Sequence, residues 1–306
     1  MRKPDDGDDE RPIRHRSNRN AGTRTPAGDV IGVDPRTDRQ RLTTEAYATS
    51  APLRQRLRLY DYQVDPAEFD LREWVLHRVD PRPGAIVVDV GCGPGRYLSA
   101  IAKRDASATA IGFDLSAGMA AEAAAHGPVG VADAIALPVP DRSTDVLLAA
   151  HMLYHVADMR FAIAEFARIV RTDGTVAIVL NGDHHLPEMY ALLGAAVRRA
   201  GGPPGLRERT FQRAVLDAAA PLVADHFADV QRAETTGAIV VPDAAPVVAY
   251  LDSLRSLYDD LPVEWNAVLD AGTQLVTATI ARNGAWRTQS HVGVLLARMP
   301  VPSSGR

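Results

Sequence analysis

One short pattern combines a carboxylate with the bare backbone that ligand-binding loops need. A carboxylate and three alternating glycines make it up: Asp89, Gly91, Gly93 and Gly95. It follows an apolar run over residues 85–90 that predicts a buried strand. Glycine adopts positive φ and lets a ligand lie against the main chain. A dinucleotide-binding loop needs a glycine where Arg96 stands, so the pattern argues against a pyrophosphate-bearing cofactor.

Three later stretches extend this candidate site. In AIGFDLSAGM (residues 110–119), a predicted strand ends at Asp114, at the spacing where an acid accepts hydrogen bonds from ribose hydroxyls. VADAIALPVPDRSTDVLLAAHMLYHV (131–156) contains another strand, which ends near His151. ARIVRTDGTVAIV (167–179) turns at Gly174 into a fourth.

Together these stretches resemble the class I S-adenosylmethionine-dependent methyltransferases, in particular the small-molecule branch related to ubiquinone and menaquinone methylation enzymes. The resemblance covers residues 45–182 well and residues 205–298 weakly. It implies S-adenosylmethionine as cofactor and S-adenosylhomocysteine as product. Asp89 would then meet the ammonium group, Asp114 the ribose and Asp133 the adenine amine. The cofactor-binding residues that the resemblance implies are Asp89, Gly91, Cys92, Gly93, Gly95, Tyr97, Asp114, Leu115, Met119, Asp133, Ala134 and His151.

The elements that must position these residues alternate along the chain. Apolar runs predict strands at 85–90, 108–113, 144–150 and 175–181, and helical patterns fall at 95–104, 117–125, 158–170 and 187–200. Such alternation is typical of parallel strands with crossover helices. Further on, residues 211–227 and 245–258 predict helices, and residues 228–241 and 288–299 predict strands. The expected fold is α/β, a Rossmann-like doubly wound sheet; the resemblance implies seven strands with the last antiparallel.

The chain divides into five predicted regions. Residues 1–41 have almost no large apolar side chains, so we expect a disordered tail. The others are an N-terminal helical cover (42–80), the cofactor-binding core (81–182), the C-terminal part of the sheet with substrate-cover helices (183–299) and a loose tail (300–306).

Side chains for the transfer itself are expected on loops at the carboxyl end of the sheet. Histidine titrates near neutral pH and suits a general base; the candidates are His151, His155 and His185. Contacts to the acceptor are predicted for Tyr60, Tyr62, Tyr154, His184 and His185. Structural packing is the alternative for each of them. Arg54, Arg56 and Arg58 are expected to be solvated, with recognition of an acidic substrate as the alternative.

Composition limits the partners. A net charge of −4 without a basic stripe does not favour a nucleic-acid partner. No apolar run approaches a membrane span, and the first residues do not resemble a signal peptide, so we expect a cytoplasmic protein. The single cysteine, Cys92, excludes an internal disulfide, and no metal is expected. The protein is predicted to be a monomer or homodimer.

These observations predict methyl transfer from S-adenosylmethionine to a small organic acceptor. The histidines favour oxygen as the methylated atom, and an alanine- and arginine-rich composition suggests bacterial secondary metabolism, such as antibiotic biosynthesis. Two alternatives remain open: a methyltransferase acting on RNA or protein, and a cofactor-binding regulator that transfers no methyl group.

Overall fold

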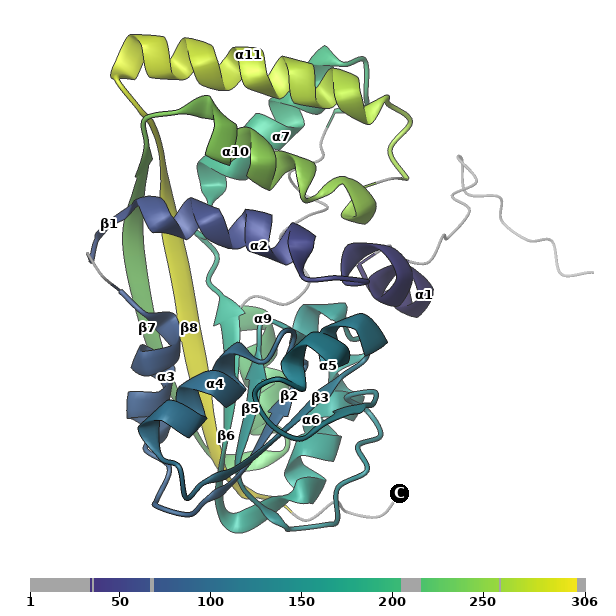
Figure 1. The fold of residues 1–306 in the computed structure, drawn as a ribbon, viewed down its shortest axis with the longest axis vertical. Helices are drawn as coiled ribbons and strands as arrows, with labels where there is room; N and C mark the ends of the chain where they lie inside the picture. The colour runs from purple at the N-terminus through teal and green to yellow at the C-terminus, as the bar shows by residue number, and fades with distance from the viewer. Residues whose placement is uncertain (1–33, 35, 67–68, 205–215, 259, 302–306) are drawn as a thin grey trace, which may run out of the picture. The chain divides into compact units, whose positions relative to one another are not determined.

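The computed structural model describes residue 34 and residues 36–66, 69–204, 216–258 and 260–301 (Figure 1). All of them belong to one unit that starts at Val33. Most of the predicted tail lies outside the described residues. Its predicted boundary at residue 41 is too late, however, because residues 39–41 form helix α1 (Arg39–Arg41) and Thr37 is buried.

The described strands form one eight-stranded sheet with the order β1-β7-β8-β6-β5-β2-β3-β4. Their bounds are β1 Gln63–Asp65, β2 Ile86–Val90, β3 Thr109–Asp114, β4 Val129–Val131, β5 Thr144–Ala150, β6 Val170–Asn181, β7 Phe227–Val241 and β8 Trp286–Pro300. Strands β2 to β6 run parallel, and β8 lies antiparallel between β6 and β7. The predicted doubly wound sheet with an antiparallel last strand is confirmed. The short edge strand β1, antiparallel to β7, adds an eighth strand.

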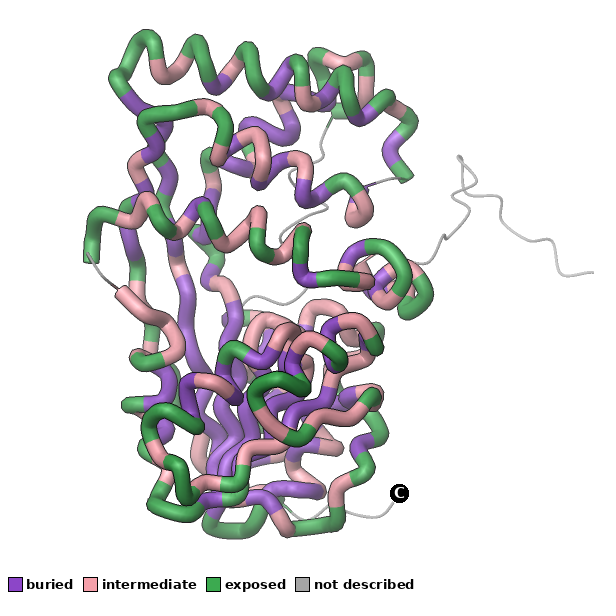
Figure 2. The backbone as a smooth tube through the Cα atoms, viewed as in Figure 1, coloured by how far each residue is buried: buried purple, intermediate pink, exposed green. Residues whose placement is uncertain are grey.

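Alternate side chains of the central strands pack into two separate cores. On β6, Val176 and Ile178 join the core shared with α6 (Met159–Ile169) and α9 (Leu216–Ala224). Ala177 and Val179 join the opposite core, which contains residues of α3 (Leu71–Val79) and α4 (Arg96–Arg104). A period of two sends successive side chains to opposite faces, so helices cover both faces. Buried backbone accordingly runs through the middle of the sheet in Figure 2.

A third apolar cluster lies at the far end of the long strands β7 and β8. It contains buried residues of α7 (Pro187–Arg199), α10 (Ala244–Asp252) and α11 (Trp265–Asn283). In Figure 1 these helices lie at the top, and α2 (Ala51–Leu57) lies between them and the helices around the central strands. Helix α5 (Ala117–Ala123) follows β3. The sequence did not predict α11 or β4, and the predicted helix at 211–227 is described only from residue 216.

Candidate active site

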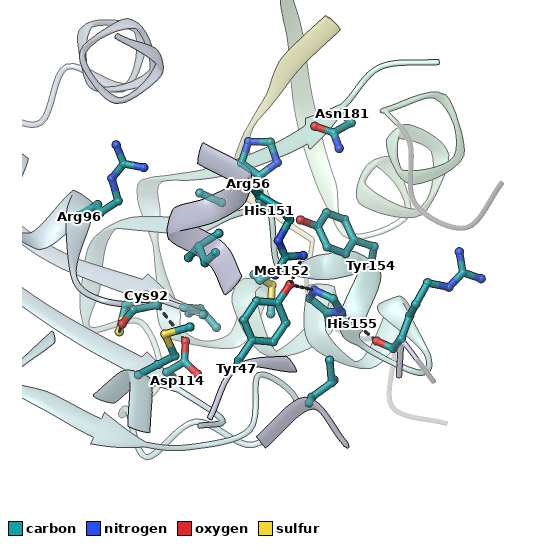
Figure 3. Close-up of a pocket in the computed structure, with 18 of the residues that line it drawn as sticks. Tyr47, Arg56, Cys92, Arg96, Asp114, His151, Met152, Tyr154, His155 and Asn181 are labelled. Atoms are coloured by element: carbon teal, nitrogen blue, oxygen red, sulfur yellow. Dashed lines mark hydrogen bonds between the residues drawn. The ribbon is translucent and has the colours of Figure 1, made fainter. Parts of the chain in front are cut away.

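A cavity of about 860 Å³ opens at the carboxyl ends of β2, β3, β5 and β6. This volume is near the upper end of the range for small-molecule sites, roughly 300–1,000 Å³. The glycine loop forms one end, and a group of tyrosines from α7, α10 and the N-terminal segment (residues 36–66) forms the other. Figure 3 shows part of its lining. The cavity is therefore large enough to hold more than one binding region.

The glycine loop follows β2 as the sequence predicts. Gly91, Gly93 and Gly95 all have positive φ. A Cβ on Gly91 would lie 2.6 Å from Cβ of Met152, so the loop packs tightly there. A Cβ on Gly93 would meet nothing nearer than Leu53 at 3.9 Å and would point into open space. Gly91 and Gly93 line the cavity, whereas Gly95 is the N-cap residue of α4 and does not. The open side of Gly93 is where a ligand can approach the backbone.

Two carboxylates flank this loop, in different surroundings. Asp114 accepts hydrogen bonds from the backbone N–H groups of Gly93 and Ser116, both at 2.8 Å. Asp89 is 1% exposed, and its buried Oδ2 has no hydrogen-bond partner. Burial, with the charge of Asp114 nearby, raises the pKa of Asp89 to about 7. The buried hydroxyl of Tyr97 also lacks a partner. Since buried polar groups are rarely left unpaired, these atoms are suited to a polar ligand.

The remaining predicted cofactor residues also line the cavity: Cys92, Leu115, Met119, Asp133, Ala134 and His151. Asp133 accepts a hydrogen bond from the N–H of Ile135 and pairs with Arg39 at 2.6 Å. Burial raises the pKa of the Cys92 thiol, so Cys92 is a neutral filler rather than a nucleophile.

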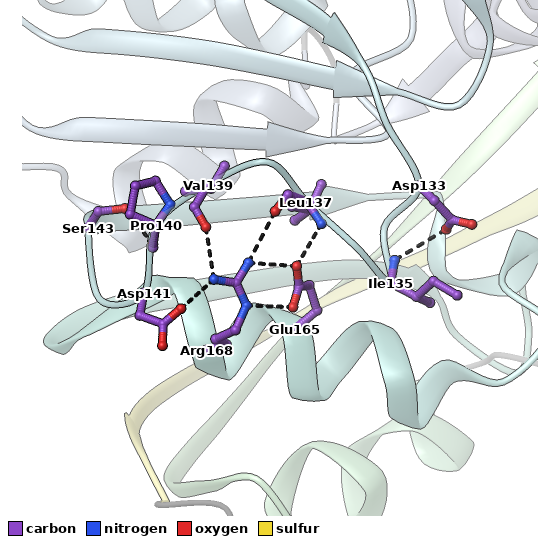
Figure 4. A network of polar contacts seen from close by, with 9 residues as sticks. All are labelled: Asp133, Ile135, Leu137, Val139, Pro140, Asp141, Ser143, Glu165 and Arg168. Atoms are coloured by element: carbon purple, nitrogen blue, oxygen red, sulfur yellow. Dashed lines mark hydrogen bonds and ion pairs between the residues drawn. The ribbon is translucent and has the colours of Figure 1, made fainter.

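A polar network fixes the loop that follows Asp133 (Figure 4). Arg168 on α6 pairs with Glu165 and Asp141 and donates to the carbonyl oxygens of Leu137 and Val139. Glu165 accepts the N–H of Leu137 at 2.6 Å. The network binds the backbone of Leu137 and Val139 and the side chain of Asp141, so it fixes the loop that leads from Asp133 and Ala134 to β5.

The predicted general bases differ in what their ring nitrogens contact. In His185, the N–H of His291 donates to Nδ1 (3.1 Å), so the proton of the neutral ring lies on Nε2, beside the Tyr60 hydroxyl (2.9 Å). In His155, Nδ1 lies 2.8 Å from the carbonyl oxygen of Arg36 and must donate, which leaves Nε2 to accept from Tyr47. Neither ring keeps a lone pair for an acceptor proton. This geometry argues against the base role predicted for both.

His151 is the remaining candidate. It follows β5 with a φ of 54°, a conformation uncommon outside glycine, and it lines the cavity. Among the described residues, its ring has no hydrogen-bond partner, so both nitrogens can meet a ligand. Burial lowers the pKa of His151 to about 4, which keeps the ring neutral at pH 7.

The structure places some of the predicted acceptor contacts in the cavity and others outside it. Tyr60, Tyr154 and His185 line the cavity. Tyr62 packs against the apolar cluster of α7, α10 and α11 instead, and exposed His184 stacks on His291. Lining residues that the sequence did not single out include Tyr47, Met152 and Asn181. Each of them lies at the end of a strand or next to a helical turn. In the sequence, this location is the only feature that could have indicated that they line the cavity.

The prediction that Arg56 is solvated is wrong. Its Nε and Nη2 atoms are buried, and the side chain lines the cavity between Tyr47 and Tyr154. The helical spacing of Leu53, Leu57 and Tyr60 could have indicated this, because Arg56 lies on the same face. Arg54 and Arg58 are exposed as predicted.

A glycine loop directly after the first parallel strand of a doubly wound sheet is typical of Rossmann-like folds. Residues 88–178 match the family described as "Methyltransferase domain". Nocamycin O-methyltransferase of Saccharothrix syringae is 33% identical over 61% of this chain and 66% of that protein. Trans-aconitate 2-methyltransferase of Methylobacterium radiotolerans is 29% identical over 73% of this chain and 87% of that protein. The chain belongs to the class I S-adenosylmethionine-dependent methyltransferases.

A solved structure agrees with this assignment at the level of the fold. Haemonchus contortus phosphoethanolamine N-methyltransferase 2, in complex with phosphomonomethylethanolamine and S-adenosylhomocysteine, superposes with a TM-score of 0.53. The match is 16% identical and covers 86% of this chain and 60% of that chain. The chain spans 32%, 66% and 49% of the length of three of the curated relatives that it matches. The quinone-related branch stays a prediction.

The cofactor of this family, S-adenosylmethionine, fits the glycine-loop end of the cavity. Asp89 would hold its ammonium group with the oxygen that now lacks a partner, and the open side of Gly93 leaves room beside the backbone. Elsewhere in the described chain, no three His, Cys, Asp or Glu side chains gather as metal ligands would. None of the described helices combines the length and apolar character needed to cross a membrane.

Proposed function

We propose that this protein transfers the methyl group of S-adenosylmethionine to an oxygen of a small organic acceptor, as part of bacterial secondary metabolism. One observation carries the proposal: the glycine-loop end and the tyrosine-lined end belong to one cavity, so a cofactor and an acceptor can meet inside it. The relatives named as O-methyltransferases support oxygen as the methylated atom.

The bound cofactor supplies an activated methyl group. The protein positions the acceptor relative to this group and excludes water from the site. Asp89, Asp114 and Asp133 bind the cofactor, and residues 47–50, which are hydrogen-bonded to the start of α5 and to Glu122, cover it. Aligning the two reacting atoms at about 3–3.5 Å contributes several kcal/mol to catalysis. His151 lies where an acceptor proton could be received, although with a pKa of about 4 it is a weak base.

Calorimetry with S-adenosylhomocysteine tests the cofactor assignment. Asp114→Ala removes the carboxylate that would accept the ribose hydroxyls and that holds the N–H of Gly93. Hydrogen bonds to a charged group are worth about 1.5–3 kcal/mol, so affinity should fall by at least about tenfold. Asp173→Ala, at an exposed site, is the control and should bind as the wild type does. Equal affinity in both variants would refute the assignment. Transfer of labelled methyl to bulk RNA or protein, but to no small molecule, would instead favour a macromolecular acceptor.

A further inference from the structure

Arg56 is a charged residue whose guanidinium is largely buried in the cavity wall. The Nε and Nη2 atoms of its guanidinium are buried and meet no hydrogen-bond partner. Nη1 donates to the Tyr47 hydroxyl at 3.4 Å, and the guanidinium lies 5.2 Å from the centre of that ring. No carboxylate pairs with Arg56 among the described residues. A buried charge without a partner is costly unless a ligand completes it.

The two free nitrogens are the edge of the side chain that binds carboxylates elsewhere in this chain. Nε and Nη2 together hold one carboxylate in four other arginines: Arg36 with Asp34, Arg72 with Asp70, Arg160 with Asp158 and Arg168 with Glu165. This planar, two-point geometry matches a carboxylate better than a neutral group. The same edge of Arg56 lacks a partner among the described residues.

The surroundings of Arg56 belong to the tyrosine-lined end of the cavity. Its electrostatic neighbours are Tyr47, Tyr154 and Tyr250. Arg96, by contrast, begins α4 beside the glycine loop, and its neighbours are Arg72, Asp70 and Tyr97. The two cations share none of these neighbours, so they belong to different parts of the cavity lining. Arg96, directly after the glycine loop, is the cation placed to meet an anion on the amino-acid part of the cofactor. Arg56 is left for the acceptor.

The chain also fixes Arg56 in place. Tyr47 donates its hydroxyl proton to His155, whose other nitrogen donates to the carbonyl oxygen of Arg36. The Tyr47 oxygen can therefore accept only from Arg56, and Nη1 is held on it. Burial lowers the pKa of His155 to about 4, so this chain of hydrogen bonds keeps its direction at neutral pH.

We propose that the acceptor carries a carboxylate, and that Nε and Nη2 of Arg56 bind it in the tyrosine-lined end of the cavity. The inference rests on the proposed function, because it names the chemical class of the acceptor for that same transfer. It makes Arg56 a determinant of specificity for acids over their neutral analogues.

A library of carboxylic acids, each paired with its carboxamide, tests this with the full chain and its cofactor. Binding to the protein loaded with S-adenosylhomocysteine and release of S-adenosylhomocysteine during turnover are both measured. Wild type should prefer acids, and Arg56→Gln should reduce that preference by roughly 30-fold or more while cofactor affinity stays within about twofold. Arg56→Lys, which keeps the charge without the planar edge, should retain part of it. Arg58→Gln, exposed two residues away, is the matched control.

The outcomes separate this inference from the proposed function. A library in which no acid is preferred to its amide, or a preference that survives in Arg56→Gln, overturns the role of Arg56 while cofactor binding still stands. Loss of S-adenosylhomocysteine affinity in Arg56→Gln would show that Arg56 binds the cofactor, and this result also overturns its role in acceptor binding. Failure of the wild type to bind S-adenosylhomocysteine refutes the proposed function itself.

Discussion

Asp89 and Asp114 line the same cavity, but their carboxylates differ in their hydrogen bonds. Two backbone N–H groups satisfy Asp114, whereas Oδ2 of Asp89 is buried and unpaired. Burial first, and then the charge of Asp114, raises the pKa of Asp89 to about 7. A cation that binds beside Asp89 favours the ionised form. Ligand binding and loss of this proton are therefore coupled.

We expect S-adenosylhomocysteine to release protons when it binds at pH 6.5, where its own amino group stays charged. Because Asp89 must ionise, affinity should rise as the pH increases from 6 to 7. Calorimetry in two buffers with different ionisation enthalpies measures the release. Asp89→Asn should abolish it and weaken binding, and Asp173→Asn should leave it unchanged. Identical apparent enthalpies in the two buffers would contradict the coupling.

At the scale of single residues, sequence predicted side chains near the glycine loop better than those at the tyrosine-lined end. Asp89, Gly93 and Asp114 lie close to their strands, so strand position sets where they are. The roles of His155 and His185 depend on Tyr47 and Tyr60, which are 108 and 125 residues away. The sequence around each histidine does not indicate partners that lie so far away along the chain.

At the scale of elements, the N-terminal segment is joined to α5, the helix that follows Asp114. Ser116 donates to the carbonyl oxygen of Tyr47 at 2.7 Å. The Ser50 N–H donates to Glu122 at 2.9 Å, and Arg54 pairs with the same carboxylate. A Cβ on Gly118 would lie 1.9 Å from the Ala48 carbonyl oxygen. Close backbone contact here keeps the cover over the cofactor end.

Gly118→Ala should separate the cover from α5. The new methyl group displaces residue 48, so S-adenosylhomocysteine should dissociate about tenfold faster, as measured by stopped-flow. Gly194→Ala is the matched control, because its Cβ would meet only Arg198 at 3.5 Å within a helix. Alanine in place of a helical glycine stabilises by roughly 0.5–1 kcal/mol, and the control should show this gain without faster dissociation. Equal dissociation rates in both variants would exclude this role for the contact.

The elements that sequence predicted best are the apolar strands and amphipathic helices between residues 85 and 200. β5 has the predicted bounds, and α4 and α7 differ from prediction by one residue at an end. β4 has only three residues, too few for a periodic signal. α11 is rich in threonine and alanine, and its buried residues form only a narrow stripe. The pairing of β7 with β8 over their whole length depends on register, which no local pattern encodes.

At the scale of the whole molecule, three histidines are kept neutral by burial around one cavity. Burial lowers the pKa of His151 and His155 to about 4 and that of His185 to about 3. In the unfolded chain each would titrate near 6.5. Between pH 6.5 and 4 the unfolded state therefore binds more protons, and stability falls as the pH falls. The raised pKa of Asp89 has the opposite effect on stability as the pH falls. It offsets the contribution of about one of the three histidines.

His155→Gln should flatten this pH dependence. One histidine shifted from 6.5 to about 4 contributes up to about 3 kcal/mol of stability, present above pH 6.5 and lost towards pH 4. Urea unfolding at pH 7 and pH 5 should show wild type losing stability on acidification and His155→Gln losing less, whatever the variant costs at pH 7. His184→Gln, at an exposed site, should keep the wild-type difference. If His155→Gln loses as much stability on acidification as wild type does, the His155 ring is not held neutral, and the hydrogen-bond direction that leaves the Tyr47 oxygen to accept from Arg56 is wrong.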